Sequence, residues 1–461
     1  MLDHPARPSR FVSTIVLTVL AAAAAMPPAA AAVLPGMRPA AGPRLPTGSH
    51  TEPLRVQSMA FYEGANENTD LPASFMAANY AWTEQGAGAQ TADAFHNAGG
   101  AHAMQYTDSN ARNCSSDKPG SCDDFLTLLN NLPEEAWLHE AGNSSVRVFG
   151  NGQQRNNPLD SAFQTAWTEQ IDVLMNPSQG GSAAYTAAEG GSIELDTYNW
   201  QNLGTFTELG GPEYEITQNQ QVVTAEVATV SRTPTYAVGN GVDYDYPQGG
   251  AYDAFLSQAG SALIGMFNEN AFAVAYGSGY MTSAYPVTNA WQNQQDGVLD
   301  VIGRHKYDFV WMEGDPPPAH RLYGLASFWL TMDKTYSVLW EDFCAPDNTP
   351  KGLCNSTWDD AGIVPTHPRT TATTTIATLL VGTLYVREFT RCYQGSVALG
   401  PCASVVNPGG SSAAWPILVG HYQRTIALPT TSLYGGGRVA WTTGLPPSIP
   451  AHGAAIVAGQ P

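Results

Sequence analysis

The chain has 461 residues, of which only 13% are charged, and its formal net charge at pH 7 is −20. Because phosphate groups bind to cationic surfaces, this balance argues against a nucleic acid or an anionic membrane as a partner. The composition fits an extracellular protein that meets a neutral or cationic partner.

The N-terminal residues have the pattern of an export signal. Two arginines precede an apolar stretch over 11–26, and a run of small residues follows over 29–32. This order predicts a signal peptide over 1–32, with an uncleaved membrane anchor as the alternative. Residues 33–53 are rich in proline, alanine and glycine and are predicted to be a flexible leader. No later segment is apolar for long enough to span a bilayer, so we expect a secreted or periplasmic protein that does not contact the membrane once the signal is removed.

The six cysteines fall as three close pairs, namely Cys114 with Cys122, Cys344 with Cys354, and Cys392 with Cys402. An even count, local spacing and an export signal favour three disulfides that hold surface loops in shape. A zinc site is the alternative, but no pair has the C-x-x-C spacing and no histidine cluster accompanies the cysteines.

Short apolar runs alternate with helical stretches through most of the chain. The predicted strands are 56–62, 79–82, 101–106, 192–195, 235–238, 271–276, 309–312 and 336–340. The predicted helices are 123–131, 159–175, 218–231, 252–267, 287–304, 321–332 and 366–389. Their number and order predict an α/β fold, a (β/α)8 TIM barrel over 54–390, with a doubly wound open sheet as the alternative. Residues 391–461 contain further β-like stretches, at 396–399, 404–406, 425–428 and 438–441, and are predicted to be a small C-terminal β-rich tail.

Several catalytic motifs are missing from the sequence. It has no G-x-S-x-G elbow, no second histidine four residues after His139, and no phosphate-binding glycine loop. These absences argue against a serine hydrolase, a zinc peptidase and a nucleotide-dependent enzyme. Asp243 and Asp245 form a D-x-D pair, which leaves a metal-dependent sugar transferase as an alternative.

Acidic residues at predicted strand ends are the strongest functional signal. The apolar runs over 192–196 and 307–313 close on Asp196 and Glu313, the ends of the fourth and seventh predicted strands. The carboxyl ends of barrel strands meet at one mouth, and glycoside cleavage needs one protonated and one ionised carboxyl group. We expect Asp196 and Glu313 to be the acid/base and nucleophile, in either order, although each could instead cap a helix or a turn. Glu194 shares a strand face with Asp196 and could support it or be the real partner.

Other residues near these strand ends are predicted to bind substrate, because aromatic faces stack on sugar rings and polar groups fix sugar hydroxyls. They are Glu63, Tyr198, Trp200, Asn240, Tyr276, Asp315 and Glu341. Glu341, from the eighth predicted strand, is also a rival for the catalytic pair. Trp311 lies within a strand and is predicted to belong to the core.

Four short segments carry a family resemblance. They are Ile193-Glu-Leu-Asp196, Phe309-Val-Trp-Met-Glu313, Tyr385-Val-Arg-Glu-Phe389 and Val405-Val-Asn-Pro408. In this order they resemble glycoside hydrolase barrels similar to the endo-polygalactosaminidase-like enzymes, in which a strand-four aspartate lies in the pocket. The resemblance implies that Asp196 is the site aspartate and Glu313 its partner from strand seven.

The chain departs from that family in two places. The segment over 392–402 lengthens the connection between the last two motifs, and Thr197 and Tyr198 follow Asp196 where such barrels often have Asn or Asp. The sequence therefore predicts a secreted, monomeric glycoside hydrolase that acts on a polysaccharide or glycan and needs no metal or cofactor. A catalytically silent carbohydrate-binding or cell-surface barrel is the alternative.

Overall fold

The computed structural model describes most of the chain after residue 55. The described ranges are 56–61, 72–85, 89–108, 111–112, 132–196 with short breaks, 232–240, 261–273 without 270, 290–314, 318–343, 362–428 and 439–459. The predicted signal peptide and leader, and the predicted helices over 123–131 and 218–231, lie outside these ranges. No helix among the described residues is both long and apolar enough to cross a membrane.

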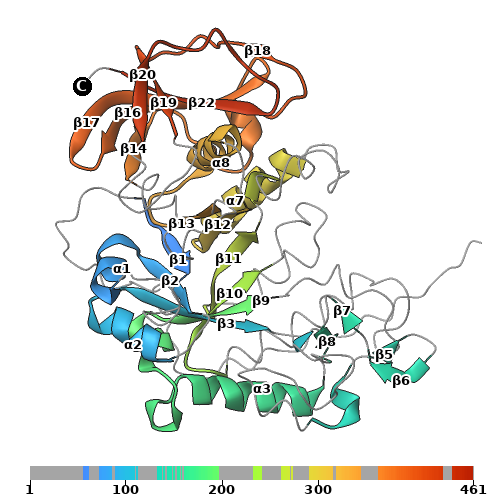
Figure 1. Ribbon diagram of the computed structural model, residues 1–461. Coiled ribbons are helices and arrows are strands. Elements are labelled where there is room, and N and C mark those ends of the chain that lie inside the picture. Colours follow the sequence, from blue (N-terminus) through green and yellow to red (C-terminus); the bar gives the residue numbers. More distant parts are fainter. Residues whose placement is uncertain are drawn as a thin grey trace, which may run out of the picture. The chain divides into compact units, whose positions relative to one another are not determined.

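Eight parallel strands form the first sheet (Figure 1). In spatial order they are β1 (Met59–Phe61), β2 (Trp82–Gln85), β3 (His102–Asp108), β9 (Ser192–Asp196), β10 (Tyr236–Asn240), β11 (Leu263–Glu269), β12 (Tyr307–Gly314) and β13 (Ser337–Phe343). A parallel bridge between Ser58 and Leu339 joins the first strand to the last, and the Leu339 N–H donates to the Gln57 carbonyl at 2.9 Å. The sheet is therefore closed, so the prediction of a (β/α)8 barrel is confirmed and the open doubly wound sheet is wrong.

The described helices of the barrel are α1 (Ala73–Asn79), α2 (Ala89–Asn97), α3 (Ser161–Leu174), α7 (Ala290–Gly303) and α8 (Pro318–Thr331). The predicted helices over 159–175, 287–304 and 321–332 are confirmed by α3, α7 and α8. The start of α3 shows why its sequence is helical, because the Asp160 carboxylate accepts the N–H groups of Ala162 and Phe163. Phe163, Trp167 and Ile171 follow at four-residue spacing and are buried on one face.

Short elements fill the connections on either side of α3. Before it lie β4 (Ala111–Arg112), η2 (Glu134–Ala136), β5 (His139–Glu140), β6 (Asn143–Arg147), β7 (Phe149–Gly150) and β8 (Gln153–Arg155). After it lie the single 3-10 turns η3 (Pro177–Gln179), η4 (Ala183–Tyr185) and η5 (Ala187–Glu189), and η8 (Ala271–Ala273) follows β11.

The sixth barrel strand was predicted in the wrong place. The sequence assigned a strand to 271–276 and a helix to 252–267, but the strand is β11 (Leu263–Glu269) and residues 271–273 form η8. The apolar residues of β11 lie at 263, 264, 266 and 267, a spacing of three and four that also fits a helix. Because this strand is buried on both faces, its sequence lacks the alternation of apolar and polar residues that would distinguish a strand from a helix.

Side chains alternate between the two faces of the barrel strands. Trp82 of β2 and Phe309 of β12 meet across the interior, with ring centroids 4.9 Å apart. The neighbouring residues on the strands, such as Ala103, Ile193 and Leu195, pack instead against the surrounding helices. Interior and exterior positions can therefore be assigned by counting in twos along each strand.

The second sheet is antiparallel and lies in the C-terminal part of the chain. Its order is β14 (Ile363–Pro368), β16 (Leu384–Gln394), β17 (Val397–Asn407), β22 (Gly453–Ala458), β19 (Arg424–Ala427) and β20 (Ala440–Thr443), with β15 (Leu380–Val381) paired to β16. A separate pair is formed by β18 (Ala413–Ala414) and β21 (Ser448–Ile449). The prediction of a β-rich tail is confirmed.

The predicted helix over 366–389 is wrong. That segment contains parts of β14 and β16, the strand β15, and the 3-10 turn η10 (Ile376–Leu379). Its many threonines are β-branched and favour extended backbone, and Gly382 makes the hairpin turn between β15 and β16 at φ 66°.

The C-terminal sheet packs one face against α8. The side chain of Arg387 in β16 donates to the carbonyls of Trp329, Leu330 and Met332 at 3.1, 3.0 and 2.9 Å, and the Ser404 hydroxyl in β17 donates to the Ala326 carbonyl at 2.6 Å. These bonds join the sheet to the last helix of the barrel.

One of the three predicted disulfides lies among the described residues. Cys392 of β16 and Cys402 of β17 are bonded, with their Cα atoms 5.8 Å apart, and both are fully buried. This prediction is confirmed. Cys114, Cys122, Cys344 and Cys354 lie outside the described residues.

Candidate active site

The barrel places Asp196 and Glu313 at the ends of its fourth and seventh strands, as the strand count predicted. Asp196 is the last residue of β9, and its backbone pairs with Asp108, the last residue of β3. Glu313 is the next-to-last residue of β12, and its backbone pairs with Asp342 of β13. Two pairs of acidic residues therefore lie opposite each other in the backbone pairing at the carboxyl ends of the strands, one pair on β3 and β9 and the other on β12 and β13. Their catalytic role stays a prediction.

The other predicted site residues divide into two groups. Asn240 is the last residue of β10 and pairs with Phe267, and Glu341 in β13 pairs with Met312. Both are thus at the same end of the barrel as the acids. Glu63, Tyr198, Trp200, Tyr276, Asp315, and the D-x-D residues Asp243 and Asp245, lie outside the described residues.

Two further acids at strand ends were missed. Glu84 is the third residue of β2 and is only 5% exposed, and it follows Trp82 by two residues, on the interior face. Glu269 is the last residue of β11, and its backbone pairs with Trp311. The signal for both was available, since each closes a short apolar run. Glu269 was overlooked because the sixth strand was predicted after residue 270, whereas Glu84 lies two residues after the predicted end of the second strand and was not included.

Glu194 lies inside the barrel. Its backbone pairs with Tyr106 on one side and Val238 on the other, and its side chain is 1% exposed. Ile193 and Leu195 on either side of it belong to the core between the sheet and the helices. The interior face of β9 thus carries a buried carboxyl group two residues before Asp196.

An aromatic cluster fills the barrel interior next to these strand ends. The indoles of Trp311 and Trp340 stack with centroids 4.4 Å apart and planes 6° from parallel. Phe267 meets both rings edge-on, at 6.3 and 5.9 Å, and stacks on Phe309 at 4.9 Å. Trp311 packs against the interior core, so the prediction that it is a core residue is confirmed.

The amino ends of the strands are closed by a different set of side chains. His102 of β3 lies 4.2 Å from Trp82, centroid to centroid, and its Nδ1 is 2.9 Å from the Gly190 carbonyl oxygen. Burial lowers the pKa of His102 to about 4, although this bond acts against the shift, so the ring is neutral near pH 7. These contacts stabilise the closed end and leave the acidic end as the candidate site. Within the described ranges, no group of three His, Cys, Asp or Glu residues is arranged to hold a metal ion.

Comparison with known proteins identifies no family. No family model matches the chain, and no curated protein matches it. Among solved structures, it is similar to a trehalulose synthase from Pseudomonas mesoacidophila at 9% identity and a TM-score of 0.44, over 89% of this chain and 100% of that one. It is also similar to an Anoxybacillus alpha-amylase at 7% identity and a TM-score of 0.42, over 88% of this chain and 98% of that one. A pullulanase from Bacillus acidopullulyticus is 10% identical with a TM-score of 0.39, over 89% of this chain and 61% of that one. Likenesses this distant say nothing about activity, and the barrel assignment follows from the strand pairing.

Proposed function

We propose that the protein is a glycoside hydrolase that cleaves a polysaccharide or glycan with Asp196 and Glu313. The observation that supports this most is their placement at the ends of the fourth and seventh strands of a closed parallel barrel. Catalytic residues of such barrels come from the carboxyl ends of several strands. Acids alone could serve many reactions, but a pair of carboxyl groups is what glycosidic cleavage requires.

The two carboxyl groups would have different roles in catalysis. One, protonated, donates its proton to the leaving glycosidic oxygen, and the other, ionised, attacks the anomeric carbon or activates a water molecule. A separation of about 5–5.5 Å would give retention of configuration and about 6.5–9.5 Å inversion. The aromatic cluster behind the strand ends would keep the adjacent acids on a rigid base.

We also propose that the protein works outside the cytoplasm, as a monomer, after removal of residues 1–32. The Cys392–Cys402 disulfide supports this location, because disulfides persist in oxidising compartments. Amino-terminal sequencing of the protein from a secreting host would test the cleavage site, and size-exclusion chromatography with light scattering would test the oligomeric state.

The activity is tested with purified mature protein on a panel of polysaccharides that includes starch, pullulan, xylan, a mixed-linkage β-glucan and polygalactosamine. We expect reducing ends to appear with at least one of them. Asp196→Asn and Glu313→Gln are each expected to lower kcat by about a thousandfold, because each removes a group that moves a proton or forms a bond in the transition state.

Asp300→Asn is the matched control, since it removes a carboxylate on α7 that pairs with Arg304 at 2.9 Å. We expect its kcat to equal that of the wild type. Full activity of the Asp196→Asn protein would refute the assignment. Binding of a glycan without any product would favour the catalytically silent barrel instead, and loss of activity with a chelator would favour the metal-dependent transferase.

A further inference from the structure

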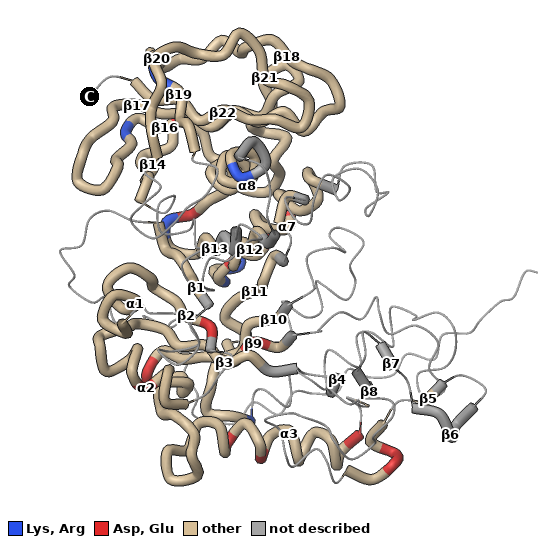
Figure 2. Tube along the Cα trace, in the orientation of Figure 1, with Lys and Arg blue, Asp and Glu red and all other residues tan. Residues whose placement is uncertain are grey.

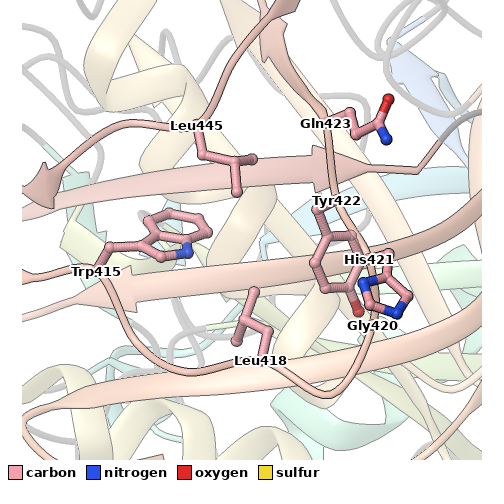
Figure 3. Close-up of a pocket in the computed structure, with 7 residues that line it drawn as sticks. All are labelled: Trp415, Leu418, Gly420, His421, Tyr422, Gln423 and Leu445. Atoms are coloured by element: carbon pink, nitrogen blue, oxygen red, sulfur yellow. The ribbon is translucent and has the colours of Figure 1, made fainter.

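The C-terminal sheet has an open cavity on the face that does not pack against α8. Its volume is about 280 Å³, and it is lined by residues from 415–423 and by Leu445. Figure 3 shows the rings of Trp415 and Tyr422 on opposite sides of the cavity, with Leu418 and Leu445 between them. His421 and Gln423 complete the lining with polar groups, and both side chains are exposed.

The Trp415 ring is held in place by the sheet on which it lies. Trp415 is partly buried and packs against the core cluster on this face of the sheet, which includes Val386, Val405 and Ile449. Its backbone N–H donates to the Pro447 carbonyl at 3.2 Å. One part of the indole is thus anchored while the rest lines the cavity, so a ligand would meet a ring that is already ordered.

A buried carboxylate fixes the loop that forms the cavity wall. Glu388 of β16 is 9% exposed and accepts the backbone N–H groups of Val419 and Gly420 at 2.9 and 2.8 Å. It also accepts the Tyr422 hydroxyl at 2.5 Å. Because this hydroxyl is bonded to Glu388, Tyr422 lines the cavity with its ring and not with a free hydroxyl. Preorganisation of this kind lowers the entropic cost of binding.

The two segments that contain the lining residues carry no charged side chains of Lys, Arg, Asp or Glu. Residues 411–423 and 439–459 contain no Lys, Arg, Asp or Glu, in a chain whose formal net charge is −20. Figure 2 shows the trace around β18 and β21 without acidic or basic residues. None of the lining residues is Lys, Arg, Asp or Glu, so the lining complements a neutral ligand with one apolar face and several hydroxyls.

We propose that this cavity is a second carbohydrate site, separate from the barrel mouth, that takes one neutral sugar ring of a polysaccharide. The apolar face of the ring stacks on Trp415, and His421 and Gln423 bind its hydroxyls. The volume suits one sugar ring, so the site holds a point on a polymer and does not enclose an oligosaccharide. Ile417 and Val419, which are 94% and 77% exposed beside Leu418, extend the apolar surface along the path of such a polymer.

This inference rests on the proposed function for the class of ligand. Its test measures binding separately from cleavage, so that a failure of the second site can be distinguished from a failure of the proposed function. Affinity electrophoresis in gels that contain starch, pullulan, xylan, a mixed-linkage β-glucan or polygalactosamine measures binding of the full-length protein. The Asp196→Asn/Glu313→Gln double variant serves as the background, so that hydrolysis does not alter the gel. We expect at least one polysaccharide to retard the background protein.

On that background, Trp415→Ala is expected to weaken binding about tenfold or more, as the loss of one aromatic stack and its buried area implies. Trp441→Ala is the matched control, because Trp441 is a partly buried tryptophan of the same sheet that does not line the cavity. We expect it to bind like the background. Circular dichroism spectra of both variants must match the background protein.

The second site would be overturned by retardation with none of the five polysaccharides, or by equal retardation of the Trp415→Ala and background proteins. Equal weakening by the two tryptophan substitutions would also overturn it, because it would show a general effect on the sheet. The failure of the proposed function has a different signature, in which no substrate is cleaved but binding still depends on Trp415.

Discussion

Trp311 and Trp340 stack face to face on neighbouring barrel strands, with ring centroids 4.4 Å apart. Each stands two residues before an acid, Glu313 and Asp342, and these two acids pair in the backbone register. The stack therefore fixes the spacing of β12 and β13 immediately before the segment in which we propose catalysis. Its contribution to stability can be measured one ring at a time.

We predict that Trp340→Ala lowers the free energy of unfolding by about 3–5 kcal/mol, since removal of a fully buried large ring leaves a cavity. Trp340 is 3% exposed, whereas Trp311 is only partly buried. Trp311→Ala is therefore the matched variant and is expected to cost clearly less. Urea denaturation followed by far-ultraviolet circular dichroism measures both. Equal costs would mean that burial does not determine the contribution of these rings.

Arg387 is predicted to be the main polar link between the C-terminal sheet and α8. It donates to three carbonyl groups at the end of that helix, and it is 4% exposed. Burial lowers its pKa to about 10, partly offset by Asp333, so it remains protonated at pH 7. A cation at this position satisfies the last carbonyls of the helix and interacts favourably with its dipole.

We expect Arg387→Met to lower the free energy of unfolding by about 3 kcal/mol, because the carbonyls stay buried without a donor. Arg424→Met is the control, since Arg424 donates to the Gly459 and Leu399 carbonyls, and neither of these lies in α8. We expect this variant to lower the free energy of unfolding by only about 1 kcal/mol. Thermal unfolding of both proteins gives the comparison, and a larger loss for Arg424→Met would contradict the proposed link.

Much of the barrel could be predicted because its strands have a strong local signal. The runs that end at Asp196 and Glu313 are short, apolar and closed by an acid, which identified the fourth and seventh strands correctly. The sixth strand failed because the apolar spacing of Leu263–Glu269 fits a helix equally well. That error alone removed Glu269 from the predicted set of acids at strand ends.

The C-terminal part was harder to predict because its contacts are long-range. Arg387 and Phe389 belong to a motif on which a family resemblance was based, yet Arg387 binds the end of α8, some 55 to 58 residues earlier in the chain. Trp415 and Tyr422 line one cavity, and Glu388 of β16 holds the loop between them through Val419, Gly420 and Tyr422. No local pattern of residues predicts such partners.

Asp308 gives a prediction about how stability changes between pH 4 and pH 8. It is 2% exposed, one of its carboxylate oxygens has no hydrogen-bond partner among the described residues, and burial raises its pKa from 3.8 to about 8. Between pH 4 and pH 8 the unfolded chain loses this proton while the folded protein keeps it. The resulting loss of stability therefore grows with pH across this window and is complete above pH 8.

Asp308→Asn stays neutral at every pH, so we expect it to be more stable than the wild type, by a margin that widens from pH 4 to pH 8 and then levels off. Chemical denaturation at five or six pH values measures this margin. Asp300→Asn is the control, because its carboxylate forms a surface ion pair with Arg304 and should contribute less than about 1 kcal/mol. A margin for Asp308→Asn that does not change with pH would show that Asp308 is charged in the folded protein.

Glu388 gives the opposite pH dependence. Burial would raise its pKa, but hydrogen bonds from Tyr422, Val419 and Gly420, together with the charge of Arg369, outweigh burial and hold the pKa below its usual value. The stability that this carboxylate contributes is therefore complete above pH 4.5, where it is ionised even in the unfolded chain. It is lost as the pH falls through the lowered pKa of the folded protein.

We expect Glu388→Gln to lower the free energy of unfolding at pH 7 by about 2 kcal/mol, because the amide cannot accept all three hydrogen bonds. The difference from the wild type should shrink below pH 4. Tyr422→Phe removes only one of the bonds and is expected to cost about 1 kcal/mol. If the cavity is a carbohydrate site, Glu388→Gln should also weaken retardation in the polysaccharide gels at pH 7, because the wall over 419–422 loses its anchor. Weakened stability with unchanged retardation would show that Glu388 supports the sheet and not the cavity.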